Sequence, residues 1–147
     1  MFFFAGRYAT SVRPDKRLTI PAIFRHALEE GGIDTIFITW GMETCLYLYP
    51  ETEIQEIIRR IHDEMDSATK ELEPHKTILK VMSNGRMLRM DESGRVCIPE
   101  PFYEYARLSG SVCIIGVGNR MEIWNPDLLE EFLSSGENFD DFGMWRS

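Results

Sequence analysis

Two arginines stand directly after short polar turns, where a guanidinium group could bind DNA. Arg17 follows Arg13-Pro14-Asp15-Lys16, and Arg95 follows Asp91-Glu92-Ser93-Gly94. A guanidinium presents a rigid fork of donors that pairs with guanine O6 and N7 or with phosphate. A two-stranded β-ribbon carrying such a group fits the major groove of DNA. Either arginine could instead pair with a nearby carboxylate and hold the turn, so the sequence leaves both roles open.

The residues around these arginines shape the turns and add positive charge. The second turn has Asp91 first and Gly94 fourth, which favours a tight turn, and the first turn has Asp15 as its acid. Arg13 and Lys16 are further candidates for contact with DNA. Arg7 and Arg25 are weaker candidates for contact with DNA. Arg86 and Arg89 are weaker candidates as well, and phosphate contact is the role expected of them.

The distribution of charge matters more than its total. The chain of 147 residues has a net charge of −8, which by itself argues against a nucleic-acid partner. Residues 7–25 carry a net charge of +4 and residues 80–95 carry +2, so the remainder carries −14. Two short segments therefore carry a net positive charge while the remainder is acidic, and such segregation can place a basic face on an acidic protein.

The sequence gives little support to an enzyme, a metal site or a cofactor site. The three histidines have neither metal-ligand spacing nor a paired nucleophile: they are His26, His62 and His75. The segment Gly116-Val117-Gly118 lacks the third glycine of a dinucleotide-binding loop and leads into a strand. We expect no small-molecule substrate.

The cysteines and the apolar segments indicate a cytoplasmic protein. Cys45, Cys97 and Cys113 are far apart and odd in number, so we expect three buried, reduced thiols. The apolar start of the chain ends after a few residues at Gly6-Arg7, which is too short for a secretory signal. No apolar run reaches the roughly 18 residues that span a bilayer.

The chain contains two diverged copies of one unit. Residues 17–24 and residues 95–102, 78 positions apart, share Arg, Ile, Pro and Phe at matched places. Gly32 then matches Gly110. After a shortening of three residues, segment 46–49 matches segment 121–124. Two copies indicate a duplication rather than a solenoid, which needs about three or more repeats.

Each copy has the same predicted order of strand, turn, strand, helix and two further strands. The strands of the first copy are predicted at 8–12, 17–20, 35–39 and 45–49, and those of the second at 87–90, 95–98, 112–117 and 121–124. Pro21 and Pro99 end the second strand of each copy and suit the first turn of a helix. The helices are predicted at 22–30 and 102–108, and glycines close them.

A helical spacer separates the copies. Isoleucines and Met65 recur at helical spacing between 54 and 65, and we expect this stripe to join the core rather than to form a groove for a partner. A polar break at 67–74 precedes a helix at 75–83, and a last helix is predicted at 126–133. The predicted divisions are 1–50 and 84–135 for the halves, 51–83 for the spacer and 136–147 for a flexible acidic and aromatic tail. We expect the halves to fold as one unit, because neither can bury much alone.

The sequence resembles the MraZ family, which belongs to the AbrB/SpoVT-like group of bacterial DNA-binding proteins. The resemblance is carried by Asp91-Glu92-Ser93-Gly94-Arg95-Val96-Cys97-Ile98-Pro99 and by Gly116-Val117-Gly118-Asn119-Arg120-Met121-Glu122-Ile123-Trp124. Cys45-Leu46-Tyr47-Leu48-Tyr49-Pro50 matches the end of the first copy, and the match runs from about Gly6 to Leu133.

The resemblance implies an α+β fold: a duplicated, swapped-hairpin AbrB-like β-barrel with a helical spacer and peripheral helices. It also implies a ring-shaped homo-oligomer that binds direct repeats in double-stranded DNA, upstream of the division and cell-wall gene cluster, and regulates transcription there. The family pattern is an Asp followed four residues later by an Arg in both copies. Here the first copy has Arg13 in place of Asp and Lys16 in place of Gly, and so loses an acceptor within its turn.

A second function class stays open beside DNA binding. The chain could be a ring-forming assembly protein that binds other proteins through its acidic surface. Salt discriminates the two classes, because binding to DNA phosphates weakens steeply as salt rises and an apolar protein interface does not.

Overall fold

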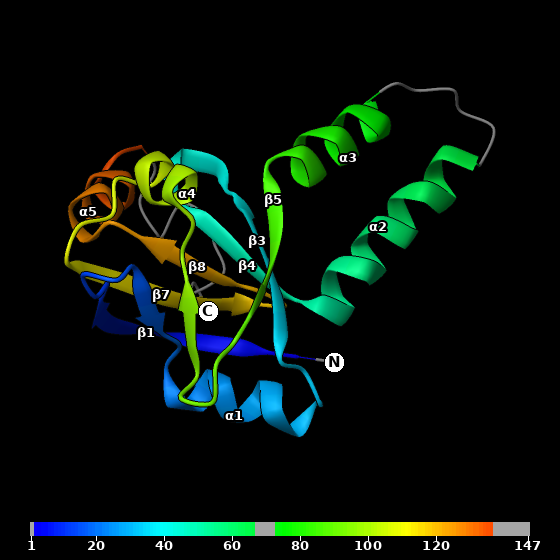
Figure 1. The fold of residues 1–147 in the computed structure, drawn as a ribbon. Helices are drawn as coiled ribbons and strands as arrows, with labels where there is room; N and C mark the ends of the chain where they lie inside the picture. Colours follow the sequence, from blue (N-terminus) through cyan, green and yellow to red (C-terminus); the bar gives the residue numbers. More distant parts are fainter. Residues whose placement is uncertain (1, 67–72, 137–147) are drawn as a thin grey trace, which may run out of the picture.

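The computed structural model describes residues 2–66 and 73–136, which form a mixed α+β fold (Figure 1). The elements of the first copy are β1 (Phe4–Ser11), β2 (Arg17–Thr19), α1 (Ala22–Glu30), β3 (Thr35–Trp40), the 3-10 turn η1 (Met42–Thr44) and β4 (Leu46–Pro50). The spacer forms α2 (Glu51–Asp66) and α3 (Glu73–Ser83). The second copy forms β5 (Gly85–Arg89), β6 (Arg95–Cys97), α4 (Glu100–Tyr105), β7 (Ser111–Gly118), β8 (Met121–Trp124) and α5 (Pro126–Ser134).

These elements confirm the predicted strands and helices, with shifts at their ends. β1 begins four residues earlier than predicted, and α4 covers 100–105 instead of 102–108. Pro74, assigned to the break, lies in the first turn of α3, where its missing amide donor leaves no helical hydrogen bond unmade. The rest of the break, residues 67–72, and nearly all of the predicted tail, residues 137–147, lie outside the described residues.

The strands of both copies form one six-stranded antiparallel sheet, in the order β1-β7-β8-β4-β3-β5. β1 pairs with β7, β4 with β8 and β3 with β5, and each of these pairs joins one copy to the other. Strands β1, β3 and β4 of the first copy correspond to β5, β7 and β8 of the second. When each strand is replaced by its counterpart, the result is the same order read from the opposite edge of the sheet. The sheet therefore has an approximate two-fold symmetry, which follows from the duplication.

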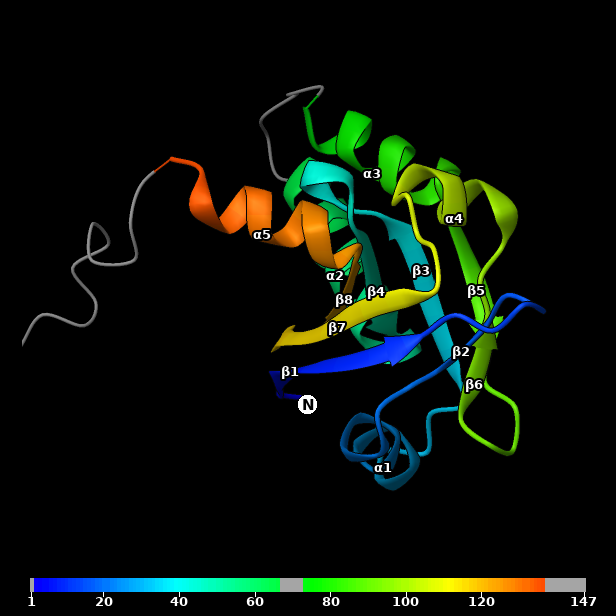
Figure 2. The same cartoon turned by 90° about the vertical axis from the view of Figure 1, so that its left-hand side faces the viewer.

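The main core lies between this sheet and a separate two-stranded ribbon, β2 with β6 (Figure 2). Leu18 and Val96 of the ribbon are buried, as are Phe24 and Leu28 of α1. They pack with the apolar residues of one sheet face, including Ile36, Ile38, Leu46, Leu48, Ile114, Met121 and Ile123. The ribbon is thus fixed to the core by its inward side chains, which leaves its other face free to carry polar groups.

The spacer helices form an arm that leaves the sheet, and the predicted apolar stripe is only partly in the core. Ile54, near the start of α2, is buried, whereas Ile57, Ile58 and Ile61 are half-buried. The prediction that this stripe joins the core is therefore correct for Ile54 and wrong for the rest, because α2 and α3 point away from the sheet (Figure 1).

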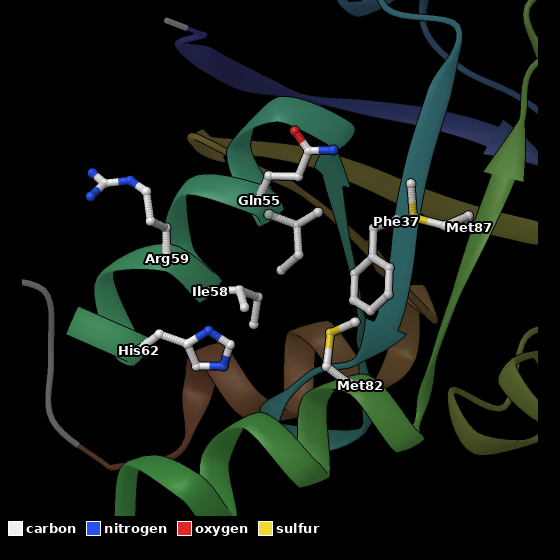
Figure 3. Close-up of a pocket in the computed structure, with 8 residues that line it drawn as sticks. Phe37, Gln55, Ile58, Arg59, His62, Met82 and Met87 are labelled. Atoms are coloured by element: carbon white, nitrogen blue, oxygen red, sulfur yellow. The ribbon is translucent and has the colours of Figure 1, made fainter. Parts of the chain in front are cut away.

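A groove of about 420 Å³, here called the arm groove, lies between the arm and strands β3 and β5. Ile58 of α2 and Met82 of α3 face Phe37 and Met87 of the strands across it (Figure 3). Gln55, Arg59 and His62 lie along its α2 side. An apolar hollow of this kind is typical of a surface that another chain covers.

Candidate nucleic-acid interface

The β2–β6 ribbon brings the two arginines of the sequence prediction onto one surface. Leu18 pairs with Val96 and both point inward, so the neighbouring side chains on each strand point outward. Arg17 lies opposite Cys97, and Thr19 lies opposite Arg95. The side chain of Arg17 is 47% exposed and that of Arg95 is 24% exposed. We call the outward ribbon residues and the two turns, residues 13–16 and 91–94, the hairpin face. It lies at the opposite side of the molecule from α5 (Figure 2).

The two turns have the same backbone hydrogen bonds. In the first turn, the amide of Arg13 donates to the carbonyl of Arg17 at 3.0 Å, and the amide of Lys16 donates to the carbonyl of Arg13 at 2.8 Å. In the second turn, the corresponding bonds run from the amide of Asp91 to the carbonyl of Arg95 at 2.9 Å and from the amide of Gly94 to the carbonyl of Asp91 at 3.0 Å. Each turn is also bonded to the other copy, since Ile20 N donates to Gly94 O at 2.9 Å and Ile98 N donates to Lys16 O at 3.0 Å. Each turn is therefore held by the residue that follows the ribbon strand of the other copy.

Asp91 organises the second turn and fixes the arginine that follows it. Its Oδ1 accepts hydrogen bonds from the amides of Ser93 and Arg95, both at 2.9 Å. Its Oδ2 accepts a hydrogen bond from Nε of Arg95 at 3.1 Å. The bond from the Arg95 amide, followed by that from Ser93 and the charge of Arg95, lowers the pKa of the Asp91 carboxyl. Asp91 is therefore ionised at neutral pH.

The first turn holds its arginine less tightly. Asp15 Oδ1 accepts a hydrogen bond from the Arg17 amide at 3.2 Å, so the acceptor lost with Arg13 is replaced in part by the acid two positions later. The guanidinium of Arg17 lies 3.8 Å from Asp15 and 3.7 Å from Asp91, and Arg13 lies 3.7 Å from Asp15. These are loose ion pairs between exposed groups, which contribute little to stability.

The helices of each copy support the turn of the other copy. Arg25 of α1 lies over the second turn, where its Nη1 donates to Ser93 O at 2.9 Å. At the matched place in α4, the ring of Tyr103 lies 5.7 Å from the ammonium of Lys16, which also pairs with Glu100. Sequence reasoning offered Arg25 as a DNA contact and missed its supporting role, because no local pattern links residue 25 to residue 93.

Comparison with known proteins decides the family. The family model for the MraZ protein, whose description likens the family to antitoxins, matches residues 3–74 and 82–141. The chain is 30% identical over 134 residues to the transcriptional regulator MraZ of Cytophaga hutchinsonii, covering 90% of this chain and 86% of that protein. It is 33% identical to the protein of the same name from Micrococcus luteus, over 91% of this chain and 89% of that protein.

The chain belongs to the MraZ family. A third relative of the same name, from Bifidobacterium longum, is 32% identical over 90% of this chain and 83% of its own length. The family model covers both copies of the unit and the spacer between them except residues 75–81. None of the described helices is both long and apolar enough to cross a membrane.

In this MraZ family member, two of the weaker candidate residues form ion pairs and a third lies on an edge strand. Arg7 on β1 donates to Glu130 of α5 at 2.8 Å, on the far side of the molecule from the ribbon. Arg89 lies 3.1 Å from Asp34. Arg86 is exposed on the edge strand β5. The structure thus separates Arg7 from the hairpin face, whereas Arg89 stands two residues before its second turn.

The cysteine prediction is wrong for one of the three thiols. Cys45 and Cys113 are buried, but Cys97 is exposed on the hairpin face opposite Arg17. Burial of the neighbouring Val96 is the reason, because alternation along a strand then turns Cys97 outward. Burial raises the pKa of the Cys45 thiol to about 12.

Proposed function

We propose that this chain is a sequence-specific DNA-binding transcriptional regulator that contacts DNA through the hairpin face. The names of its relatives support a role in transcription. The observation that carries the proposal is that one ribbon, built from both copies, places Arg17 and Arg95 on the same outward surface. Guanidinium groups on a β-ribbon are suited to the major groove and to phosphate. Arg13 and Lys16 add charge beside them.

The family resemblance extends the proposal to the assembly and to the target. The chain would form a ring-shaped homo-oligomer, which would contact direct repeats upstream of the division and cell-wall gene cluster, in the cytoplasm at the nucleoid. A ring multiplies weak contacts along tandem sites, so total binding would be much stronger than binding at one repeat. The pairing of β2 with β6 is compatible with swapped hairpins joined in one chain.

A gel-shift titration tests the proposed role of the arginines. The double variant Arg17→Ala, Arg95→Ala should lose binding to a duplex from upstream of the chain's own gene cluster and keep its fold and assembly state. Arg7→Ala is the matched control, because it removes an exposed arginine on the far side of the molecule. Unchanged affinity of the double variant would reject the role of the hairpin face.

A ring-forming assembly protein remains the second candidate, and the arm groove is the observation that favours it. Its apolar lining, with Ile58, Met82 and Met87, suits a protein partner better than DNA. Salt separates the two functions: binding to DNA should weaken steeply between about 50 and 200 mM salt, and binding through an apolar groove should not.

A further inference from the structure

We propose that the two turns of one chain have different tasks at DNA. The second turn presents Arg95 as the residue that distinguishes base pairs, and the first turn supplies charge that holds the phosphate backbone of any sequence. This inference rests on the proposed DNA-binding function and assigns separate roles within it. The duplication alone would give both turns the same role, so the assignment depends on how the turns differ.

Arg95 is held in a geometry that suits a base. Asp91 Oδ2 accepts from its Nε at 3.1 Å, and the Arg95 amide is bonded to the same carboxylate at 2.9 Å. Among the described residues, neither terminal nitrogen of Arg95 has an acceptor, so both are free for a ligand. Two terminal N–H groups of one guanidinium match guanine O6 and N7. A side chain fixed before binding also loses less conformational entropy on binding.

Asp91 is the positioning residue in this arrangement, and Arg25 supports it. The carboxylate ties the turn backbone to the guanidinium, because it bonds to the amides of Ser93 and Arg95 and to the Arg95 side chain at once. Arg25 holds the carbonyl of Ser93 at 2.9 Å from the other side. The direction of Arg95 is therefore determined by the backbone of the turn.

The first turn has the charge for contact with DNA but lacks this fixation. The guanidinium of Arg17 lies beyond hydrogen-bond distance of both carboxylates near it, at 3.7 and 3.8 Å. Arg13 takes the place of the positioning acid and is 56% exposed. A mobile, exposed cation neutralises phosphate without selecting among bases. Its contribution should therefore be equal for every DNA sequence.

Substitution of each arginine by lysine tests this division without changing the net charge. The probes are a duplex from upstream of the chain's own gene cluster and a duplex of the same length and composition in shuffled order. Lysine can replace arginine at phosphate but not in a bidentate contact with guanine. We expect Arg17→Lys to keep the ratio of the two affinities and Arg95→Lys to lower it at least about tenfold. Arg13→Ala should weaken binding to both duplexes by the same factor.

The positioning role of Asp91 has a separate readout. Asp91→Asn keeps an oxygen acceptor in the turn but removes the charge that holds Arg95. We expect it to lower the affinity ratio while binding to the shuffled duplex stays equal or rises, whereas a simple loss of structure would weaken both. Circular dichroism and sedimentation of each variant check the fold and the assembly.

The outcomes separate the two levels of the argument. A wild-type protein that does not prefer its upstream duplex, or whose binding does not depend on salt, overturns the proposed function. If the wild-type protein does prefer its upstream duplex, the affinity ratios of the two lysine variants test the division of tasks. An equal fall in the ratio for Arg17→Lys and Arg95→Lys, or a fall for Arg17→Lys alone, overturns that division and leaves DNA binding intact.

Discussion

Lys16 and Gly94 have the same left-handed backbone conformation at matched places in the two turns, with φ of 65° and 74°. The neighbour decides which residue fits. A Cβ at Gly94 would overlap Cδ of Arg25, which lies over the second turn. At the first turn the matched neighbour is Tyr103, and the Lys16 side chain extends beside its ring. Each turn residue is therefore matched to the helix of the other copy.

Substitution of Gly94 by alanine should destabilise the protein. A side chain in the left-handed region costs about 1–2 kcal/mol, and the overlap with Arg25 adds to that cost. Gly110→Ala is the matched control, because Gly110 has φ of 52° and nothing within 4 Å of its Cβ position. Urea denaturation should show a larger loss of unfolding free energy for Gly94→Ala, and Arg25→Ala should remove the excess. Equal losses at the two glycines would contradict this account.

Acid should reveal the contribution of Asp91 to stability. Its folded pKa is lowered, chiefly by the hydrogen bond from the Arg95 amide. Such a group stabilises the fold above its unfolded pKa of about 3.9 and loses that contribution as the pH falls through its lower folded pKa. The stability difference between wild type and Asp91→Asn should therefore be constant near neutral pH and shrink below about pH 4. Denaturant melts from pH 7 to pH 2 measure it.

Glu92→Gln serves as the control in that series, since it removes a neighbouring charge but not the acceptor of the turn. A difference between wild type and Asp91→Asn that stays constant down to pH 2 would show that the carboxylate has no special role in the fold.

Cys97 provides a chemical probe of the hairpin face. In the folded protein an alkylating reagent at pH 8 should label Cys97 rapidly, because it is exposed, and should label Cys45 and Cys113 slowly, because they are buried. A saturating amount of the upstream duplex should slow the labelling of Cys97, as the thiol lies opposite Arg17. Peptide mapping by mass spectrometry identifies the labelled site, and Cys97→Ser is the control. Labelling at the same rate with and without DNA would place the bound duplex elsewhere.

Separation of the copies should abolish folding. Chains 1–83 and 84–147 each lack the pairing partners of their edge strands, since β1 pairs with β7 and β5 pairs with β3. We expect neither chain alone to unfold cooperatively, and an equimolar mixture to recover the circular dichroism of the intact protein. A cooperative thermal transition of either chain alone would refute the expectation that the halves fold as one unit.

Local patterns predicted most elements, because turns, prolines and alternation act over a few residues. The helix Ala22–Glu30 and the strand Met121–Trp124 match their predicted bounds. The exposure of Cys97 could also have been predicted, since Val96 before it belongs to an alternating strand. Pairing of β2 with β6 could not, because it joins residues about 78 positions apart and depends on the whole sheet.

The details of the candidate site also depend on distant contacts. Sequence identified Arg17, Arg95 and Asp91, but the replacement of a lost acceptor by Asp15 and the support from Arg25 appear only in the folded chain. An amphipathic stripe such as that of α2 shows which side is apolar but not what covers it. For that reason the stripe predicted a core, whereas the structure has the arm groove.

Fusion of the two copies into one chain gives the ribbon a polarity. In a dimer of identical subunits any substitution appears in both turns, and the matching DNA is a palindrome. Here Arg13 and Lys16 alter one turn and leave Asp91 and Gly94 in the other. A duplex laid across the ribbon therefore meets two unlike ends, and its sequence is free to differ between them.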